Sequence, residues 1–248
     1  MRRAAATTFA LTLLLYSALP ERLSAETTAK PRHVVELFTS QGCSSCPPAD
    51  ELLGELARRD DVIALSFNVD YWDYLGWKDT LASPAHTKRQ YAYARARGDN
   101  KVYTPQAVIN GLRHVVGSRP EHIKSALSAT AGRNRGHDVS LTLSSTDKDF
   151  VVDLNGTPPA GKPASIFIAT VRPAVNVKIK RGENHGRRIT YHNVVRRMMP
   201  VGTWTGGPKR ITIARRELAQ KKGERCVVLV QSAGPGAMLA AGWVPRQP

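Results

Sequence analysis

The residues best suited to chemistry in this chain are Cys43 and Cys46, which are separated by Ser44 and Ser45. Two cysteines at this spacing are typical of sites that exchange thiols and disulfides. The spacing suits that chemistry, because the second sulfur can attack a mixed disulfide formed at the first and release its partner. A helix that begins beside the pair would favour a thiolate through its unpaired N–H groups. We therefore expect Cys43 to be the exposed nucleophile and Cys46 to be the resolving thiol.

The residues on either side of the pair predict the elements that position it. The largely apolar run 33–40 predicts a strand buried on both faces, and residues 49–58 predict a helix. Cys46 and Pro47 each precede a proline, which disfavours the helical conformation for both residues. Regular helix should therefore begin no earlier than Pro48, a position that suits proline. The cysteines are expected in a tight turn between the strand and the helix.

Further strands and helices alternate after the pair. A second strand ends at Asp70, and the single helix before it predicts a right-handed crossover and parallel pairing. Tyr71 and Trp72 then open an aromatic loop beyond the carboxyl end of that strand, where ligands bind in such sheets. We assign these two residues to a substrate-contact surface, with packing under the next helix as the alternative. The later elements predicted are a helix over 84–97, a hairpin with strands 102–111 and 113–117, and a helix over 119–130.

The order β-α-β-α-β-β-α over residues 33–130 resembles a thioredoxin-like domain, an α/β fold. The resemblance rests on the cysteine turn, on Thr104 and Pro105 at the start of the third strand, and on the hairpin. It implies that Pro105 follows a cis peptide bond and faces the cysteines, and that Thr104 offers its backbone to a substrate peptide. It also implies a buried carboxylate that relays protons, for which Glu36 is the candidate. The alternative is that Glu36 reaches water.

More narrowly, the chain resembles an uncharacterised bacterial family of predicted secreted proteins, domain of unknown function 1223. The segments that carry this resemblance are 36–50, 68–72, 103–106 and, in the second half, 181–184. The family implies a fold and redox chemistry but no substrate. The dipeptide between the cysteines differs from the Gly-Pro of reducing thioredoxins and from the Pro-His of strong oxidants, so the direction of electron flow stays open.

The second half of the chain has a different pattern. Residues 138–248 contain short alternating runs between turn signals, which predicts an all-β, sandwich-like domain. Residues 131–137 are a predicted linker. The polar turn 183–188 contains two adjacent arginines that suit an anion, but a plain loop is the favoured interpretation. Cys226 lies in an apolar run and is expected to be a buried, inert thiol.

The N-terminal residues predict export. Two arginines precede an apolar run over 9–19, which is too short to span a bilayer, and a small-residue cleavage site ends at Ala25. We expect a signal peptide over 1–25 that is cleaved after Ala25, an exposed lead over 26–32, and a periplasmic or secreted protein. An uncleaved N-terminal anchor is the alternative.

The chain is strongly basic, with a formal net charge of +16. The excess lies late, since residues 172–225 contain 15 Lys and Arg and 3 acidic residues. Charge of this size bears on partners and solubility and not on fold. Solvated outer faces of strands are the favoured explanation, and weak electrostatic contact with an anionic membrane or cell-wall surface is the alternative. Nucleic acid is not an expected partner of an exported protein.

Three functions are compatible with these patterns. The first is an exported thiol–disulfide oxidoreductase that needs no cofactor and acts on a protein or small thiol or disulfide. The second is a thioredoxin-like copper carrier, in which His114 would join the two thiolates. That function is disfavoured, because such carriers space their cysteines by three residues. The third is a non-enzymatic binding module in which the disulfide between Cys43 and Cys46 is structural.

Overall fold

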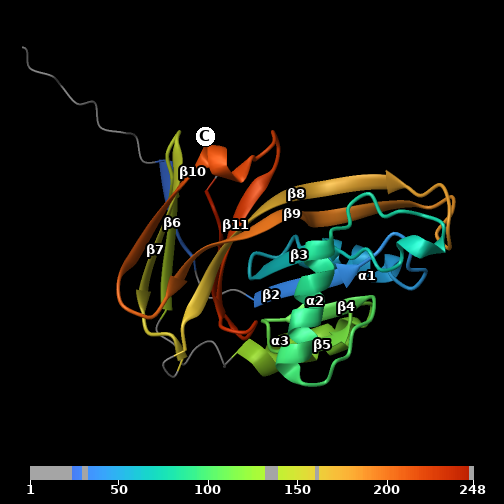
Figure 1. The fold of residues 1–248 in the computed structure, drawn as a ribbon, viewed down its shortest axis with the longest axis horizontal. Coiled ribbons are helices and arrows are strands. Elements are labelled where there is room, and N and C mark those ends of the chain that lie inside the picture. Colours follow the sequence, from blue (N-terminus) through green and yellow to red (C-terminus); the bar gives the residue numbers. More distant parts are fainter. Residues whose placement is uncertain (1–23, 30–32, 132–138, 160–161, 246–248) are drawn as a thin grey trace, which may run out of the picture.

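The computed structural model describes residues 24–29, 33–131, 139–159 and 162–245. These residues form a large sheet, a smaller sheet and three α-helices, which lie on the two faces of the large sheet (Figure 1). The strands are β1 (Ser24–Ala29), β2 (His33–Thr39), β3 (Val62–Asn68), β4 (Gln106–Ile109), β5 (Arg113–Val116), β6 (Val139–Ser145), β7 (Asp149–Gly156), β8 (Ala164–Lys178), β9 (Arg188–Trp204), β10 (Lys209–Ala214), β11 (Arg225–Ser232) and β12 (Met238–Trp243). The helices are α1 (Pro47–Leu56), α2 (Pro84–Arg97) and α3 (Pro120–Ala131), with short 3-10 turns η1 (Asp73–Leu75) and η3 (Arg215–Leu218).

The first half has the predicted order of elements, β2-α1-β3-α2-β4-β5-α3. β2 pairs in parallel with β3 and antiparallel with β4, and β4 pairs with β5. Local chemistry sets the ends of α2: the Ser83 side chain accepts the N–H of Ala85, and Gly98 ends the helix at φ 77°. α1 and α3 pack on one face of this sheet and α2 on the other. No helix among the described residues is long and apolar enough to cross a membrane.

The two halves share one sheet, which differs from the predicted division into domains at 33–130 and 138–248. The strand order is β12-β11-β8-β9-β3-β2-β4-β5, and β9 pairs in parallel with β3, where Val194 lies opposite Ser66. Asn193 strengthens this junction by donating to the carbonyl oxygen of Ala64 at 2.9 Å. Alternating runs identify strands but not the sheet that each strand joins. β8, β9, β11 and β12 therefore extend the first-half sheet.

The second sheet has the order β1-β6-β7-β10 and faces the outer strands of the large sheet. The two sheets enclose an apolar core, so the expected sandwich-like packing is present although the separate all-β domain is not. Side chains that meet in this core include Leu141, Leu143, Phe150, Val152, Ile166, Ile168, Trp204 and Val228.

β1 occupies part of the predicted exposed lead over 26–32. It pairs with β6, with Thr27 opposite Leu143 and Ala29 opposite Leu141. The predicted cleavage point after Ala25 falls within this strand. The predicted signal peptide up to residue 23, and the predicted linker apart from Ala131 at the end of α3, lie outside the described residues.

β8 and β9 form one long hairpin where shorter strands were predicted. Pro173 lies between the paired residues Arg172 and Ala174, opposite Asn193, which has φ 46°. β11 pairs with β8 only as far as Val171, so β8 is an edge strand at Pro173, where a proline is tolerated. The hairpin therefore continues over the first half of the molecule (Figure 1). Its tip, residues 179–187, is called the hairpin tip below.

We predict that Asn193→Ala lowers the free energy of unfolding by about 1–3 kcal/mol, because it removes a buried hydrogen bond and places a less tolerant residue in the left-handed region. Urea unfolding measures the change. Asn176→Ala removes an exposed asparagine of β8 in the same hairpin and should change the value by less than about 0.5 kcal/mol. Equal effects of the two substitutions would contradict a role for Asn193 in the junction.

Candidate functional site

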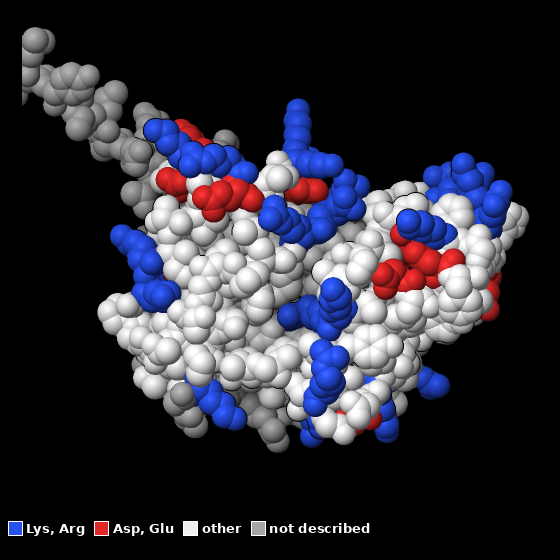
Figure 2. Space-filling view, viewed as in Figure 1, with Lys and Arg blue, Asp and Glu red and all other residues white. Residues whose placement is uncertain are grey.

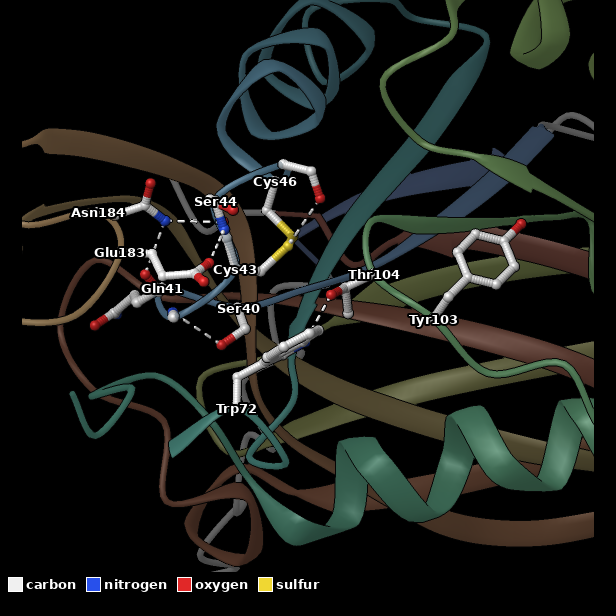
Figure 3. Close-up of a disulfide and its surroundings, with 12 residues drawn as sticks. Ser40, Gln41, Cys43, Ser44, Cys46, Trp72, Tyr103, Thr104, Glu183 and Asn184 are labelled. Carbon is white, nitrogen blue, oxygen red and sulfur yellow. Dashed lines mark hydrogen bonds between the residues drawn. A yellow bond between two sulfur atoms is a disulfide. The ribbon is translucent and has the colours of Figure 1, made fainter. Parts of the chain in front are cut away.

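A disulfide joins Cys43 and Cys46, whose Cα atoms are 5.4 Å apart, at the start of α1 (Figure 3). The helix begins at Pro47, one residue earlier than predicted, with Cys46 as its N-cap in the right-handed helical region. The N–H of Cys46 donates to the Cys43 carbonyl oxygen at 3.2 Å, and the Cys46 carbonyl accepts N–H groups from Ala49 and Asp50. This hydrogen-bonded turn leads directly into the helix and outweighs the local preference that proline imposes.

The peptide bond between Thr104 and Pro105 is cis, as predicted. Pro105 lies near the first turn of α1, because a Cβ added to Gly117 would meet the Cβ atoms of both Ala49 and Pro105 at 3.4 Å. The indole N–H of Trp72 donates to the Thr104 hydroxyl at 2.7 Å. Figure 3 shows Trp72 and Thr104 together on one side of the disulfide. The structure therefore brings Cys43, Cys46, Thr104, Pro105 and Trp72 into one region.

The hairpin tip lies on the other side of the cysteine turn (Figure 3). The side-chain amide of Asn184 donates to the carbonyl oxygens of Gln41 at 3.0 Å and Cys43 at 2.8 Å. The carboxylate of Glu183 accepts the N–H of Ser44 at 3.3 Å. Cys43 is only 2% exposed and Cys46 is fully buried. The cysteine expected to be an exposed nucleophile is thus buried, and a segment from the second half of the chain contacts the turn that holds it.

Glu36 is buried, as predicted, but it lies on the face of the sheet away from α1 and the cysteines. β2 alternates its side chains, so Val35 and Leu37 face α1 and α3, whereas Glu36 faces α2. There its carboxylate pairs with Arg89 at 2.7 Å and accepts the hydroxyl of Tyr93. It is fully buried, so the alternative in which it reaches water is wrong. Glu36 neutralises a buried arginine on the face opposite α1.

Asp50 is the buried carboxylate on the α1 face. It is one helical turn beyond Cys46, and its N–H donates to the Cys46 carbonyl oxygen at 3.1 Å. Among the described residues, neither carboxyl oxygen has a partner with good hydrogen-bond geometry, although the Thr39 side chain is near enough to offset part of the pKa shift, and the residue is 2% exposed. Burial raises the pKa of Asp50 well above its usual 3.8, and the charge of Asp79 raises it further. Tyr191 of β9 is also buried here, with an unpartnered hydroxyl whose pKa is raised by burial and by Asp50.

The two aromatic residues predicted to contact substrate have different environments. Tyr71 donates its hydroxyl to Gln90 at 3.2 Å and packs against the core under α2, where burial raises its pKa to about 12. Trp72 lies against Gly42, where an added Cβ would be 3.1 Å from the Trp72 Cβ, and it stacks on Tyr74 at 6.4 Å between ring centroids. Tyr74 is 77% exposed. Tyr71 therefore fits the alternative expectation, packing under the next helix. Trp72 and Tyr74 lie at the border of the cysteine site.

His114, the third ligand expected of a copper carrier, makes contacts away from the cysteines. His114 has both ring nitrogens engaged, by Asp99 at 3.1 Å and by Tyr103 and Gln106 at 3.0 and 3.2 Å. Among the described residues, no group of three or more His, Cys, Asp or Glu could hold a metal ion. Cys226 is buried and free, and burial raises the pKa of its thiol to about 12, as expected for an inert thiol.

Comparison with known proteins assigns the family. A family model described as "Protein of unknown function (DUF1223)" matches residues 34–231. The chain belongs to this family. A crystal structure of a protein from Agrobacterium tumefaciens, solved as a structural genomics target, is 38% identical, with a TM-score of 0.76; the match covers 86% of this chain and 93% of that one. No curated protein matches the chain.

Asn184 and Asp50 are the site residues that sequence reasoning did not single out. Both lie in segments that carried the family resemblance, Asn184 in 181–184 and Asp50 in 36–50. The position of Asp50 one turn after a cysteine was a usable signal, because residues four apart share a helix face. For Asn184, membership of that segment was the available signal, since its contacts join residues more than 140 positions apart.

Asp50 makes the stability of the protein depend on pH. Because its pKa is higher in the folded than in the unfolded chain, the unfolded chain loses this proton first, and the free energy of unfolding falls as pH rises above about 4. Asp50→Asn cannot ionise and should be more stable than the parent at pH 8 but not at pH 3.5. The gain at pH 8 should be about 1.4 kcal/mol for each tenfold difference in proton affinity between the folded and unfolded chains.

Denaturant unfolding at the two pH values measures this difference. Glu55→Gln removes an exposed carboxylate from the same helix and should leave the pH dependence unchanged. An Asp50→Asn protein with the parent's pH dependence would show that the carboxyl is not ionising in the interior.

The two amide hydrogen bonds of Asn184 connect the hairpin tip to the cysteine turn. Asn184→Ala removes both amide hydrogen bonds from the hairpin tip to the cysteine turn. Two such bonds contribute on the order of 1–3 kcal/mol, so reduction of the disulfide by dithiothreitol should become about tenfold faster or more. The control His185→Ala changes an exposed side chain of the same tip and should keep the parent's rate. Equal rates for all three proteins would exclude the hairpin tip as the barrier.

Proposed function

We propose that this protein is an exported thiol–disulfide oxidoreductase with a thioredoxin-like core. The observation that carries the proposal is the disulfide at the N-terminus of α1, beside the cis peptide bond between Thr104 and Pro105. A helix N-terminus stabilises a thiolate in the reduced state, which lowers the pKa of the attacking sulfur. The order of elements in residues 33–131 supports the thioredoxin-like core. The basic and apolar N-terminal pattern supports export to the periplasm or beyond.

The reaction exchanges two electrons between the cysteine pair and a substrate. In the reducing direction, the Cys43 thiolate attacks one sulfur of a substrate disulfide and releases the other sulfur as a thiolate. Cys46 then attacks the Cys43 sulfur, reforms the disulfide and releases the second substrate thiolate. The substrate gains the two electrons that the cysteine pair loses. The same steps in reverse oxidise a substrate dithiol.

Asp50 supplies the proton transfer that was assigned to Glu36. Cys46 attacks only as a thiolate, so its thiol must lose a proton during the second step. A buried carboxyl group with a raised pKa, one turn away on the same helix, is suited to exchange a proton with that thiol. Tyr191 and Asp79 lie close enough to Asp50 to interact with it electrostatically.

Substrate approaches between the hairpin tip and the aromatic loop. The hairpin tip must withdraw from the cysteine turn, since Cys43 is 2% exposed while both contacts of Asn184 are made. Trp72 fixes the Thr104 side chain, so the Thr104 backbone is held in place for an extended peptide. Tyr74 extends the border of this path into solvent. A protein thiol or disulfide is the favoured substrate.

Single-cysteine variants test the proposal. Cys43→Ser should abolish exchange with glutathione disulfide or a model protein disulfide, because the attacking sulfur is gone. Cys46→Ser should retain the first step and accumulate mixed disulfides, which mass spectrometry detects as added glutathione mass. Cys226→Ser is the matched control and should keep full activity. Lack of exchange by the reduced parent protein would contradict the proposal.

Burial of both cysteines favours a second candidate, a binding module whose disulfide is structural. The reduction potential separates the two functions. A catalytic pair should equilibrate with glutathione or thioredoxin-range buffers, whereas a structural disulfide should have a potential below about −300 mV. A value in the lower range, together with loss of stability on reduction, would replace the first candidate by the second.

A further inference from the structure

A cavity of about 640 Å³ lies between α2 and the strands β8, β9 and β11. Its volume falls within the range of sites that hold small organic molecules. α2 forms one wall from Ser83 to Arg95, and β9 forms the facing wall from Arg196 to Met198. The turn after β11, at Gly234 and Pro235, closes one end. This cavity lies on the α2 side of the large sheet, and none of its lining residues belongs to the cysteine site.

The walls of the cavity are basic. Lys88 and Arg95 contribute from α2, and Arg196 and Arg197 contribute from β9; all four side chains are exposed. Among the described residues that line the cavity, none is acidic. Basic side chains follow the line of α2 across the middle of the molecule in Figure 2. A concave site lined by one sign of charge concentrates ligands of the opposite charge.

The base of the cavity has an apolar surface, and the polar side chains within it already have hydrogen-bond partners. Phe67, Phe167 and Met198 provide the apolar surface. The Arg89 guanidinium lies over Phe67 and Phe167, 5.8 and 5.7 Å from the ring centroids, and is held by Glu36. Gln231 donates to Tyr93 and to the Gly236 carbonyl. Arg197 uses one guanidinium N–H on the carbonyl oxygen of Glu217, at 3.3 Å. The groups at the base satisfy one another, so the other donors of the exposed wall cations select a ligand, and the base offers it apolar contact.

We propose that this cavity binds a small amphiphilic anion, a carboxylate, sulfonate or phosphate ester with an apolar body. The head group pairs with Arg196 and Arg197 on one wall and with Lys88 on the other. The apolar body lies on Phe167 and Met198. An inorganic anion would leave the apolar base uncovered, and a neutral or cationic amphiphile would leave the wall charges unpaired. The inference is independent of the proposed redox function, because the two sites share no residue.

Calorimetric titration with three matched ligands tests this proposal. Decanoate carries both the head group and the chain, acetate lacks the chain, and decyltrimethylammonium has the same chain with the opposite charge. Decanoate should bind saturably with one molecule per chain, at least tenfold more tightly than either of the others, and more weakly as salt rises from about 20 to about 200 mM. Saturable binding of decanoate should persist in Cys43→Ser, which separates this site from the redox proposal.

Surface variants locate the binding. The double substitution Arg196→Gln and Arg197→Gln should weaken decanoate at least tenfold and reduce the salt dependence. The control double substitution Lys178→Gln and Arg188→Gln removes two exposed cations from the other end of the same hairpin and should bind as the parent does. Four results would each overturn the proposal. They are no binding of decanoate, equally tight binding of decyltrimethylammonium, binding only to anionic lipid vesicles, and equal affinities of the two double variants for decanoate.

Discussion

The pairing of β9 with β3 is the constraint on which the rest of the structure depends. It joins strands from the two halves of the chain into one sheet, with Val194 opposite Ser66 and Asn193 bonded to Ala64. Residues on either side of this junction then reach three separate places. The hairpin before β9 reaches the cysteine turn, Tyr191 lies close enough to Asp50 to interact with it electrostatically, and Arg196 lines the cavity beside α2. The surroundings of the disulfide, of Asp50 and of the cavity are therefore all completed by one strand and its hairpin.

Two buried carboxyl groups lie on opposite sides of β2, and their charges are compensated to different extents. Glu36 is paired with a guanidinium and hydrogen-bonded by a tyrosine, so its charge is compensated where it lies. Asp50 has no such partner, and burial raises its pKa. A carboxyl group without compensation is a cost to folding that is tolerated where a proton must move. This contrast, more than the identity of either residue, is the reason the proposed proton transfer is placed at Asp50 and not at Glu36.

Features that depend on near neighbours were predictable from sequence. Ser83 and Gly98 bound α2, and the cysteines lie at a strand-to-helix turn. The cis bond before Pro105 was implied by the thioredoxin-like resemblance and not by local pattern. Pairings across the chain were not predictable, because Asn193 and Ala64 are 129 residues apart and no local pattern links them. The face of Glu36 was also undetermined. A strand that is apolar on both sides has no polar face from which to tell its orientation.

The position of β3 has a consequence for synthesis. In the finished sheet β3 lies between β2 and β9, but β9 emerges from the ribosome after the whole first half. Until then β3 is an edge, with backbone groups free to pair with another chain. Its residues Val62–Asn68 are all buried in the final structure, so a nascent or truncated chain that stops before β9 would expose a template for aggregation. Correct folding of this protein therefore requires that the edge of β3 stay protected from other chains until the β8–β9 hairpin pairs with it.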